Sequence, residues 1–203
     1  MDNTSDIVIY GAGGFGREVR SMLSAGAVKG YVDDAEVRVL SQNVLVLGNS
    51  EWLKNQSDLS VVLARGDGKD RRLMYAKIKD AHHRFPSIIH PSVIFQDKSS
   101  MKIGQGCVIG AGSIFTCDIQ INNFVVINLN CTIGHDVVLE SFVSLMPSVN
   151  LSGGVFVGEG TYIGSNATVL PNIRIGKNVI VGAGAVVTKD IPDNVIVKGI
   201  PAK

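Results

Sequence analysis

His135 is the residue in the second half of this chain that is best suited to move a proton. An imidazole exchanges a proton near neutral pH, so it can act as a general base toward an amine or a hydroxyl group. Its place in the six-residue period described below puts it in a corner between strands, outside the apolar core. His82 and His83 fall in a predicted linker and His90 directly precedes the repeats, so these three are weaker candidates. An exposed histidine is usually an ordinary surface residue, and residue type alone makes His135 only a candidate.

A glycine-rich segment near the N-terminus has the composition of a phosphate-binding turn. The letters GAGGFG occupy 11–16, after a predicted buried strand from Ile7 to Tyr10 and before a predicted helix from Arg17 to about Ala25. In the strand, loop and helix order of G-x-G-x-x-G, the backbone can approach a phosphate and the helix N-terminus favours its charge. A glycine turn can also be merely structural. The matching residues are Gly11, Gly13 and Gly16.

The rest of the first 85 residues predicts half of a dinucleotide-binding fold. Asp33 and Asp34 follow Gly13 by about twenty residues, the spacing of the acidic residue in that motif. A full nicotinamide domain with a substrate domain does not fit into so short a segment, which argues against a dehydrogenase. The further predicted elements are strands at Gly30–Val32, Val44–Leu47 and Ser60–Ala64 and a helix at Lys69–Lys79.

The second half of the chain carries an apolar residue at every sixth position. A second small or apolar side chain comes two residues before nearly every one, and that spacing puts both on the same side of a short strand. The remaining residues of each hexapeptide form a corner, which the glycines at positions 104, 110, 134, 158, 164, 176 and 182 are expected to allow. No amphipathic helix has a period of six, so the pattern predicts a parallel β-helix of about five coils. The periodic residues are Ile103, Ile109, Phe115, Ile121, Ile127, Ile133, Leu139, Leu145, Leu151, Val157, Ile163, Val169, Ile175, Val181 and Val187.

Composition places the chain among compact cytoplasmic proteins. Its 203 residues are 45% hydrophobic, and they contain no apolar run long enough to span a membrane and no leader-like segment at the start. A formal net charge of +1 gives no reason to expect nucleic acid as a partner. Cys107 and Cys131 occupy inward positions of the repeat, so core packing is expected for both.

Six segments of the chain resemble one family of bacterial enzymes. The family is that of the hexapeptide-repeat sugar acyltransferases that N-acetylate nucleotide-linked 4-amino-4,6-dideoxy sugars, grouped with sialic-acid O-acetyltransferase-like proteins. The resemblance implies a nucleotide-sugar-binding βαβ domain at 1–85, a left-handed β-helix at 86–203 and a homotrimer. The similar segments are YGAGGFGREV (10–19), YVDD (31–34), FPSIIHPSV (85–93), INLNCTIGHDVVLESFV (127–143), LSGGVFVGEGTYIGSNATVLP (151–171) and VKGIPAK (197–203).

The resemblance also implies an acetyl-CoA-dependent reaction, with roles for particular residues. His135 would be the general base, Asp136 would hold its ring, and Asn128 would lie near the sugar. The three glycines of the turn would line the phosphates of the nucleotide, while Asp33 and Asp34 would contact its base or ribose. Coenzyme A would lie between neighbouring subunits, along residues that carry over as Gly153, Ala183, Gly199 and Lys203.

Two positions depart from the family. Ser144 stands where many members have a second histidine placed to contact the acetyl carbonyl, so Ser144 or a backbone N–H is expected to stabilise the oxyanion. Phe15 stands between the glycines where a histidine is common.

Three alternative functions are also compatible with the sequence. The same fold supports an O-acetyltransferase acting on a sugar hydroxyl, which is a weaker nucleophile. A zinc carbonic anhydrase is also built on this fold, but it needs three histidines around one metal, and the repeats contain only His135, so no metal is expected. In a non-catalytic module that binds nucleotide sugars, replacement of His135 would change neither binding nor function.

Overall fold

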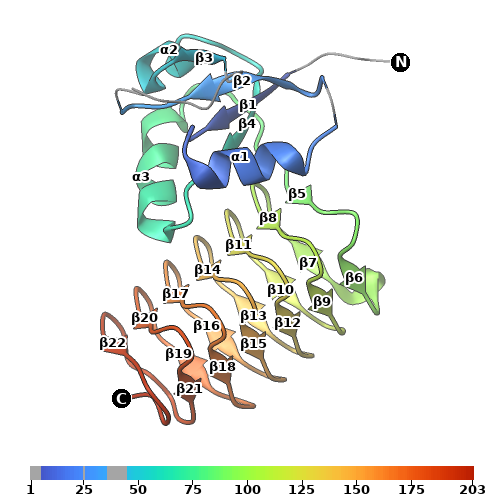
Figure 1. Cartoon of the computed structure of the whole chain (residues 1–203), viewed down its shortest axis with the longest axis vertical. Helices are drawn as coiled ribbons and strands as arrows, with labels where there is room; N and C mark the ends of the chain where they lie inside the picture. The colour runs from blue at the N-terminus through green and yellow to red at the C-terminus, as the bar shows by residue number, and fades with distance from the viewer. Residues whose placement is uncertain (1–5, 25, 36–44) are drawn as a thin grey trace. The chain divides into compact units, whose positions relative to one another are not determined.

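The computed structural model describes residues 6–24, 26–35 and 45–203. The chain divides into two compact units, Met1–Ile88 and Ile89–Lys203. The first unit mixes helices with strands, whereas the second consists of short strands in stacked sheets (Figure 1). Each unit buries its own apolar side chains, so each can be described by itself.

A four-stranded parallel sheet forms the centre of the first unit. β1 is buried from Val8 to Tyr10 because it has a neighbour on each side and apolar side chains on both faces. The strand order is β3-β2-β1-β4: β2 and β3 are added on one side of β1, and β4 is then added on the other side. In open α/β sheets, ligands bind at the carboxyl ends of the strands where the order reverses in this way, here between β1 and β4. The strands are β1 (Ile7–Tyr10), β2 (Val28–Val32), β3 (Val46–Gly48) and β4 (Ser60–Leu63).

In the described part of the first unit, three helices accompany this sheet: α1 (Gly14–Ser21), α2 (Ser50–Lys54) and α3 (Gly68–Ile78). α1 begins within the glycine turn, three residues before the predicted start. α2 was not expected from the sequence because it has only five residues, too few to show a helical period. Side chains cap the N-termini of α2 and α3: Asn49 accepts a hydrogen bond from Trp52 N at 3.1 Å, and Asp67 accepts one from Lys69 N at 2.7 Å.

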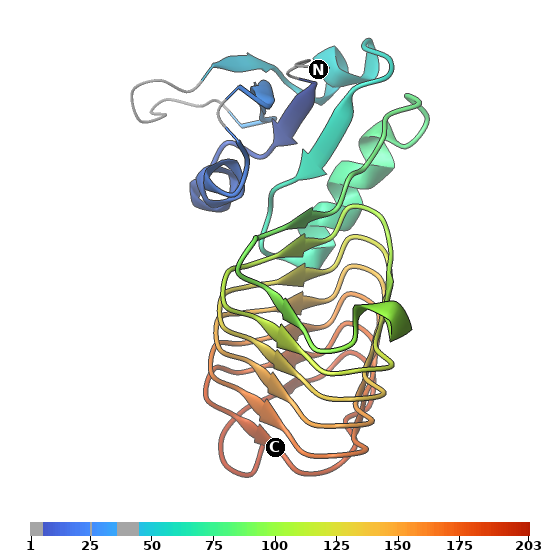
Figure 2. The same ribbon diagram turned by 90° about the vertical axis from the view of Figure 1, so that its right-hand side faces the viewer.

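The second unit is a left-handed parallel β-helix, as the six-residue period and the family resemblance together predict. Its strands form a seven-stranded, a six-stranded and a five-stranded sheet, each parallel throughout, and Figure 2 shows the coils stacked in one column. The strands are β5 (Ile88–Ile89), β6 (Ile94–Phe95), β7 (Lys102–Ile103), β8 (Val108–Ile109), β9 (Ile114–Phe115), β10 (Gln120–Ile121), β11 (Val126–Ile127), β12 (Thr132–Ile133), β13 (Val138–Leu139), β14 (Ser144–Leu145), β15 (Asn150–Leu151), β16 (Phe156–Val157), β17 (Tyr162–Ile163), β18 (Thr168–Val169), β19 (Arg174–Ile175), β20 (Ile180–Val181), β21 (Val186–Val187) and β22 (Ile196–Val197).

The strand register repeats every eighteen residues, so three hexapeptides make one coil. Ile133, for example, pairs with Phe115 on one side and with Leu151 on the other. The periodic side chains meet in the middle of the column, where every one from Ile109 to Val187 is at most 3% exposed. Burial in this core raises the pKa of the Cys131 thiol to about 11, which keeps it protonated and inert at neutral pH.

The column extends beyond the predicted repeats at both ends. β5 and β6 precede the first predicted strand and β22 follows the last, which makes six coils among the described residues. The sequence period misses these strands because its phase breaks twice. A two-residue insertion at the short 3₁₀ helix Lys98–Ser100 makes Phe95 pair with Phe115. The last coil is two residues shorter than the others, so Val181 pairs with Val197.

The glycines of the corners have a different role from the expected one. The seven glycines named above do not have a positive φ; the positive φ values fall two residues later in most repeats, as at Asp136 (φ 60°). A β-carbon on Gly134 would lie 2.7 Å from the backbone nitrogen of Gly153 in the next coil. These glycines are therefore required because adjacent coils approach closely.

Candidate functional site

His135 lies in the corner between β12 and β13, as the repeat predicts. Its Nδ1 is 2.7 Å from Oδ2 of Asp136, and the two side chains are 64% and 66% exposed. A carboxylate can only accept a hydrogen bond, so Nδ1 donates and carries the ring proton. Nε2 is then unprotonated and has a free lone pair, and it has no hydrogen-bond partner among the described residues. The pair can therefore accept a proton from a bound nucleophile.

The backbone of this corner is tied to the coils on both sides. Asp136 N donates to Cys117 O at 3.3 Å, and Gly154 N donates to His135 O at 2.8 Å. The imidazole lies against Gly153, because a β-carbon there would overlap Nε2 and come within 2.5 Å of Cε1. The ring thus occupies the space that the repeat predicts beside Gly153, and any side chain on residue 153 would displace the ring.

Asn128 and Ser144 lie elsewhere on the column. Asn128 follows β11, at the corner between the seven-stranded and six-stranded sheets, and its Oδ1 accepts a hydrogen bond from Leu129 N at 2.8 Å. Ser144 belongs to β14 of the seven-stranded sheet and is fully buried. His135 stands at the corner between the other two sheets, so one chain does not bring these three residues together.

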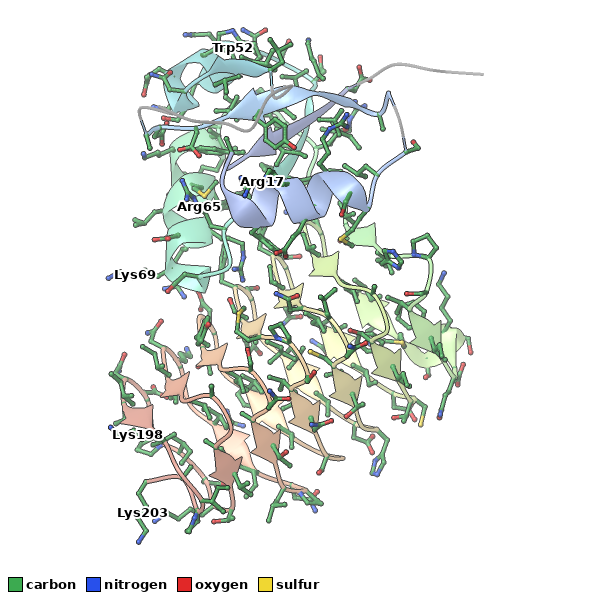
Figure 3. All side chains as sticks on the ribbon, viewed as in Figure 1. Arg17, Trp52, Arg65, Lys69, Lys198 and Lys203 are labelled. Atoms are coloured by element: carbon green, nitrogen blue, oxygen red, sulfur yellow. The ribbon has the colours of Figure 1, made fainter. Side chains whose placement is uncertain are left out.

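The residues expected to hold coenzyme A fall into two places. Gly153 is beside His135, whereas Ala183, Gly199 and Lys203 gather at the C-terminal end of the column, after strands of the seven-stranded sheet. There the tail folds back, with Lys198 and Lys203 exchanging backbone hydrogen bonds of 3.1 Å, and both side chains mark this end in Figure 3. A shallow hollow of about 400 Å³ lies beside the tail, and Lys189 and Lys203 are among its lining residues. This end offers positive charge at neutral pH.

In the first unit, the three glycines of the turn are required for different reasons. Gly11 has a φ of +114°, and a β-carbon there would lie 2.5 Å from Ala64 O. A β-carbon on Gly16 would overlap Gly11 O. Gly13 is different, since the nearest atom to its missing β-carbon is Arg65 Nη1 at 3.8 Å. Packing within the unit explains Gly11 and Gly16 but leaves the space at Gly13 open.

Asp33 is buried and bound to protein donors. It accepts hydrogen bonds from Ala12 N at 2.8 Å and Ala35 N at 3.0 Å, and Nη2 of Arg65 lies 3.1 Å from each of its oxygens. These contacts connect the glycine turn, the end of β2 and the segment after β4. Asp33 therefore holds this edge of the sheet together.

Asp34 is engaged in the same manner by a second set of donors. Its Oδ2 accepts hydrogen bonds from Tyr10 Oη at 2.5 Å and Lys77 Nζ at 2.6 Å, and its Oδ1 accepts one from Ser50 N at 2.7 Å. Although burial alone would raise it, the pKa of Asp34 is held well below its usual range by the hydrogen bonds from Lys77, Tyr10 and Ser50. Burial and the same bond raise the pKa of Tyr10 above its ordinary value.

Two basic residues of this edge, Arg65 and Lys77, were not singled out from the sequence. Arg65 directly follows Ala64 at the predicted end of a strand, a position where parallel strands expose ligand-binding residues, so this signal was present. Lys77 lies on α3 in no motif, and only the fold brings it to Asp34.

Two further properties bear on the chemistry. The described part of the chain holds no group of three or more histidine, cysteine, aspartate or glutamate side chains placed to bind a metal ion. Within the same residues, no helix has the length and apolarity needed to cross a membrane.

Comparison with known proteins finds relatives for both units. Residues 6–78 match the family described as the PglD N-terminal domain, and residues 154–189 match the bacterial transferase hexapeptide repeat. No curated protein matches the chain by sequence.

Several solved structures are similar over nearly the whole chain. A histidine variant of perosamine N-acetyltransferase from Caulobacter crescentus, in complex with CoA and GDP-perosamine, is 33% identical with a TM-score of 0.89, over 97% of this chain and 95% of that one. The acetyltransferase domain of PglB from Neisseria gonorrhoeae, in complex with acetyl coenzyme A, is 31% identical with a TM-score of 0.88, over 97% of each chain. WeeI from Acinetobacter baumannii is 25% identical with a TM-score of 0.74, over 97% and 98%.

Proposed function

Because this chain belongs to the family of hexapeptide-repeat sugar acetyltransferases, we propose that it transfers an acetyl group from acetyl-CoA to the amine of a nucleotide-linked 4-amino-4,6-dideoxy sugar. The observation that carries this proposal is the extent of the similarity to perosamine N-acetyltransferase, which covers 97% of the chain. A match of this extent spans both units of the chain. Other hexapeptide proteins that match only part of the chain give no such support.

His135 acts as the general base in this proposal. The sugar amine attacks the thioester carbonyl, the new carbon–nitrogen bond forms, and Nε2 takes the proton that the nitrogen loses. The carbon–sulfur bond then breaks, and the proton passes from the imidazolium to the departing sulfur. The hydrogen bond from Nδ1 to Asp136 supports this role, because it leaves Nε2 free to accept and stabilises the charged ring. Base catalysis of this type is worth ~10²–10⁴ in rate.

A backbone N–H is the proposed donor to the oxyanion. The backbone N–H of Gly153 has no hydrogen-bond partner among the described residues, and the same residue lies against the imidazole ring. Ser144 is buried in another sheet, which makes it the weaker candidate within one chain. A backbone donor close to the base would stabilise the tetrahedral intermediate as the amine attacks.

The acceptor's nucleotide binds the first unit. Gly13 supports this assignment, because its missing side chain serves no internal contact and leaves the backbone accessible to a phosphate. Gly11 and Gly16 give the turn its shape. Asp33 and Asp34 are bound by protein donors, so they order this edge of the sheet instead of offering free carboxylate oxygens to the base or ribose.

The assembly proposed for this chain is a homotrimer with active sites between subunits. Large apolar side chains remain exposed on the column, among them Leu129, Ile180 and Ile196. A second copy packed on these walls would cover them, and it would allow one coenzyme A to contact Gly153 of one subunit and the basic tail of another. Sedimentation equilibrium of the full-length protein at micromolar concentration is expected to give the trimer mass; a monomer would contradict the proposal.

The proposed activity is tested by supplying acetyl-CoA with GDP-, UDP- and dTDP-linked 4-amino-4,6-dideoxy sugars and following release of the CoA thiol. One of them is expected to give a product with one added acetyl group that resists alkaline hydroxylamine, as an amide does and an oxygen ester does not. A hydroxylamine-sensitive product would indicate O-acetylation instead. No CoA release above the buffer rate with any of the three would overturn the proposal.

A further inference from the structure

Arg65 stands at the carboxyl end of β4, beside the glycine turn that follows β1. Ala64 N donates to Tyr10 O at 2.7 Å, which ties the ends of these two strands together. Nη1 of Arg65 is the nearest atom to the missing β-carbon of Gly13, at 3.8 Å. Of the three motif glycines Gly11, Gly13 and Gly16, the guanidinium therefore borders the one that internal packing leaves open.

Asp33 fixes the guanidinium in this place. The carboxylate is only 6% exposed, and it is itself fixed by the backbone N–H groups of Ala12 and Ala35. A carboxylate offers about four acceptor positions, and these two bonds with the two contacts from Arg65 occupy them. Asp33 has no acceptor left for a ligand, so its influence on a ligand must pass through Arg65.

Arg71 fixes the backbone of the same segment. Its side chain is fully buried, and its Nη1 donates to the carbonyl oxygens of Arg65 and Gly66, each at 2.9 Å. Both the backbone and the charged end of Arg65 are thus held before any ligand arrives. A group oriented in advance loses less conformational freedom on binding.

Arg65 presents unused donors outward. Its side chain is 40% exposed, and Nε and Nη1 have no hydrogen-bond partner among the residues that the structure describes. A planar guanidinium matches the oxygens of a phosphate group with parallel hydrogen bonds. Arg17 adds a second guanidinium, its Nη2 3.9 Å from where a β-carbon on Gly14 would lie, and Figure 3 shows both arginines near the start of α1.

We propose that Arg65, positioned by Asp33, binds a phosphate group of the nucleotide-linked sugar and is the residue that makes the first unit selective for phosphorylated ligands. The identity of the natural ligand rests on the proposed function. The phosphate contact itself can be measured without acetyl transfer, because GDP, UDP and dTDP carry the phosphates without the amino sugar.

The test is calorimetric titration of the full-length protein with these three diphosphates and with guanosine, uridine and thymidine. Arg65→Gln keeps an amide that can donate to Asp33. It removes the positive charge and the planar guanidinium that can form two parallel hydrogen bonds with a phosphate. For the preferred diphosphate, Kd is expected to rise ~10–100-fold, the usual size of a charged hydrogen bond. The corresponding nucleoside should bind both proteins alike. In the acetylation assay, KM for the sugar nucleotide should rise with little change in kcat.

Three variants separate charge, geometry and folding. Lys29→Gln removes one exposed positive charge near the amino end of β2, whereas Arg65 lies at the carboxyl ends of the strands. This variant should leave every Kd unchanged. Arg65→Lys restores the positive charge without the planar guanidinium, so it should recover only part of the diphosphate affinity lost in Arg65→Gln. Asp33→Asn should weaken diphosphate binding because Arg65 loses its orientation. Urea unfolding followed by the fluorescence of Trp52, the single tryptophan, shows whether each variant's first unit is folded.

The outcomes distinguish this proposal from the proposed function. Equal diphosphate affinity in the wild type and Arg65→Gln would overturn it, as would a wild type that binds none of the three diphosphates. A folded Arg65→Gln variant that weakens nucleosides as much as diphosphates would also overturn it. A wild type that binds a diphosphate through Arg65 yet acetylates no nucleotide-linked amino sugar would leave the phosphate site standing and refute the acetyl transfer.

Discussion

The two units place their functional residues by different means. In the column, the position of His135 follows from counting, because every eighteen residues the chain returns to the same corner and brings Gly153 against the ring. In the first unit, Asp33 meets Arg65 and Asp34 meets Lys77 across 32 and 43 residues without any period. A site built on a repeat can be located by arithmetic. A site built on charge pairs between distant segments needs the fold.

The largest expected effect breaks the chemistry of the column and leaves the first unit intact. His135→Ala should lower kcat by ~10²–10⁴, because the proton acceptor is removed while both substrates can still bind. Steady-state kinetics should show both KM values near those of the wild type. His90→Ala is the matched control, since the imidazole of His90 forms hydrogen bonds with Ser92 alone among the described residues. A kcat within tenfold of wild type would refute the assignment of His135 as the base.

A smaller effect is expected when the first unit's phosphate site is blocked. Gly13→Val should raise KM for the nucleotide sugar by about tenfold or more, because the added carbons occupy the space left for a phosphate. The φ of −76° at Gly13 accommodates a side chain, so the turn should stay folded. KM for acetyl-CoA should not change. If both KM values stay at wild type, the glycine is structural only.

Gly11→Val provides the contrast to that prediction within the same turn. At a φ of +114° and against Ala64 O, any side chain should strain the backbone and destabilise the first unit. The urea midpoint reported by Trp52 should fall for Gly11→Val and remain near wild type for Gly13→Val. The reverse order would mean that Gly13, and not Gly11, is required for folding.

The charge pairs of the first unit should appear as a pH-dependent stability. The pKa of Asp34 is lowered on folding, so its stabilisation is complete above the unfolded value of about 4 and is lost as pH falls below it. Asp34→Asn should cost about 1 kcal/mol of unfolding free energy at pH 7, a value reduced by solvent screening because the group is partly exposed. Urea unfolding followed by Trp52 at pH 7 and pH 3 should show this cost shrinking. A cost independent of pH would contradict the assignment.

The smallest effect is expected at Ser144. It is buried in β14, away from the corner of His135, and a backbone donor is proposed for the oxyanion. The kcat of Ser144→Ala should therefore stay within about threefold of wild type, whereas removal of an engaged oxyanion donor costs ~10²–10³. A loss of that size would make Ser144 the donor, and then a neighbouring subunit would have to bring it to the site.

The fold was predictable to different depths in the two units. The fifteen periodic residues fixed the strands from β7 to β21, because a narrow column accepts only inward apolar side chains at a constant spacing. β5 and β6 lie before an insertion and β22 follows a shortened coil, and both changes break the phase. In the first unit the strand, turn and helix order was recognisable, but α2 was too short to have a pattern. The predicted strand start at Val44 lies outside the described residues.

The sequence by itself determined the repeat, its corners and the glycine turn, because local spacing and residue size dictate all three. It did not determine which glycines the backbone conformation requires and which ones a neighbouring coil requires, since that depends on how closely coils approach. Nor did it assign Asp33 and Asp34 to protein donors. A carboxylate next to a nucleotide motif looks like a ligand contact until the fold brings Arg65 and Lys77 to it, and only tertiary structure creates those pairs.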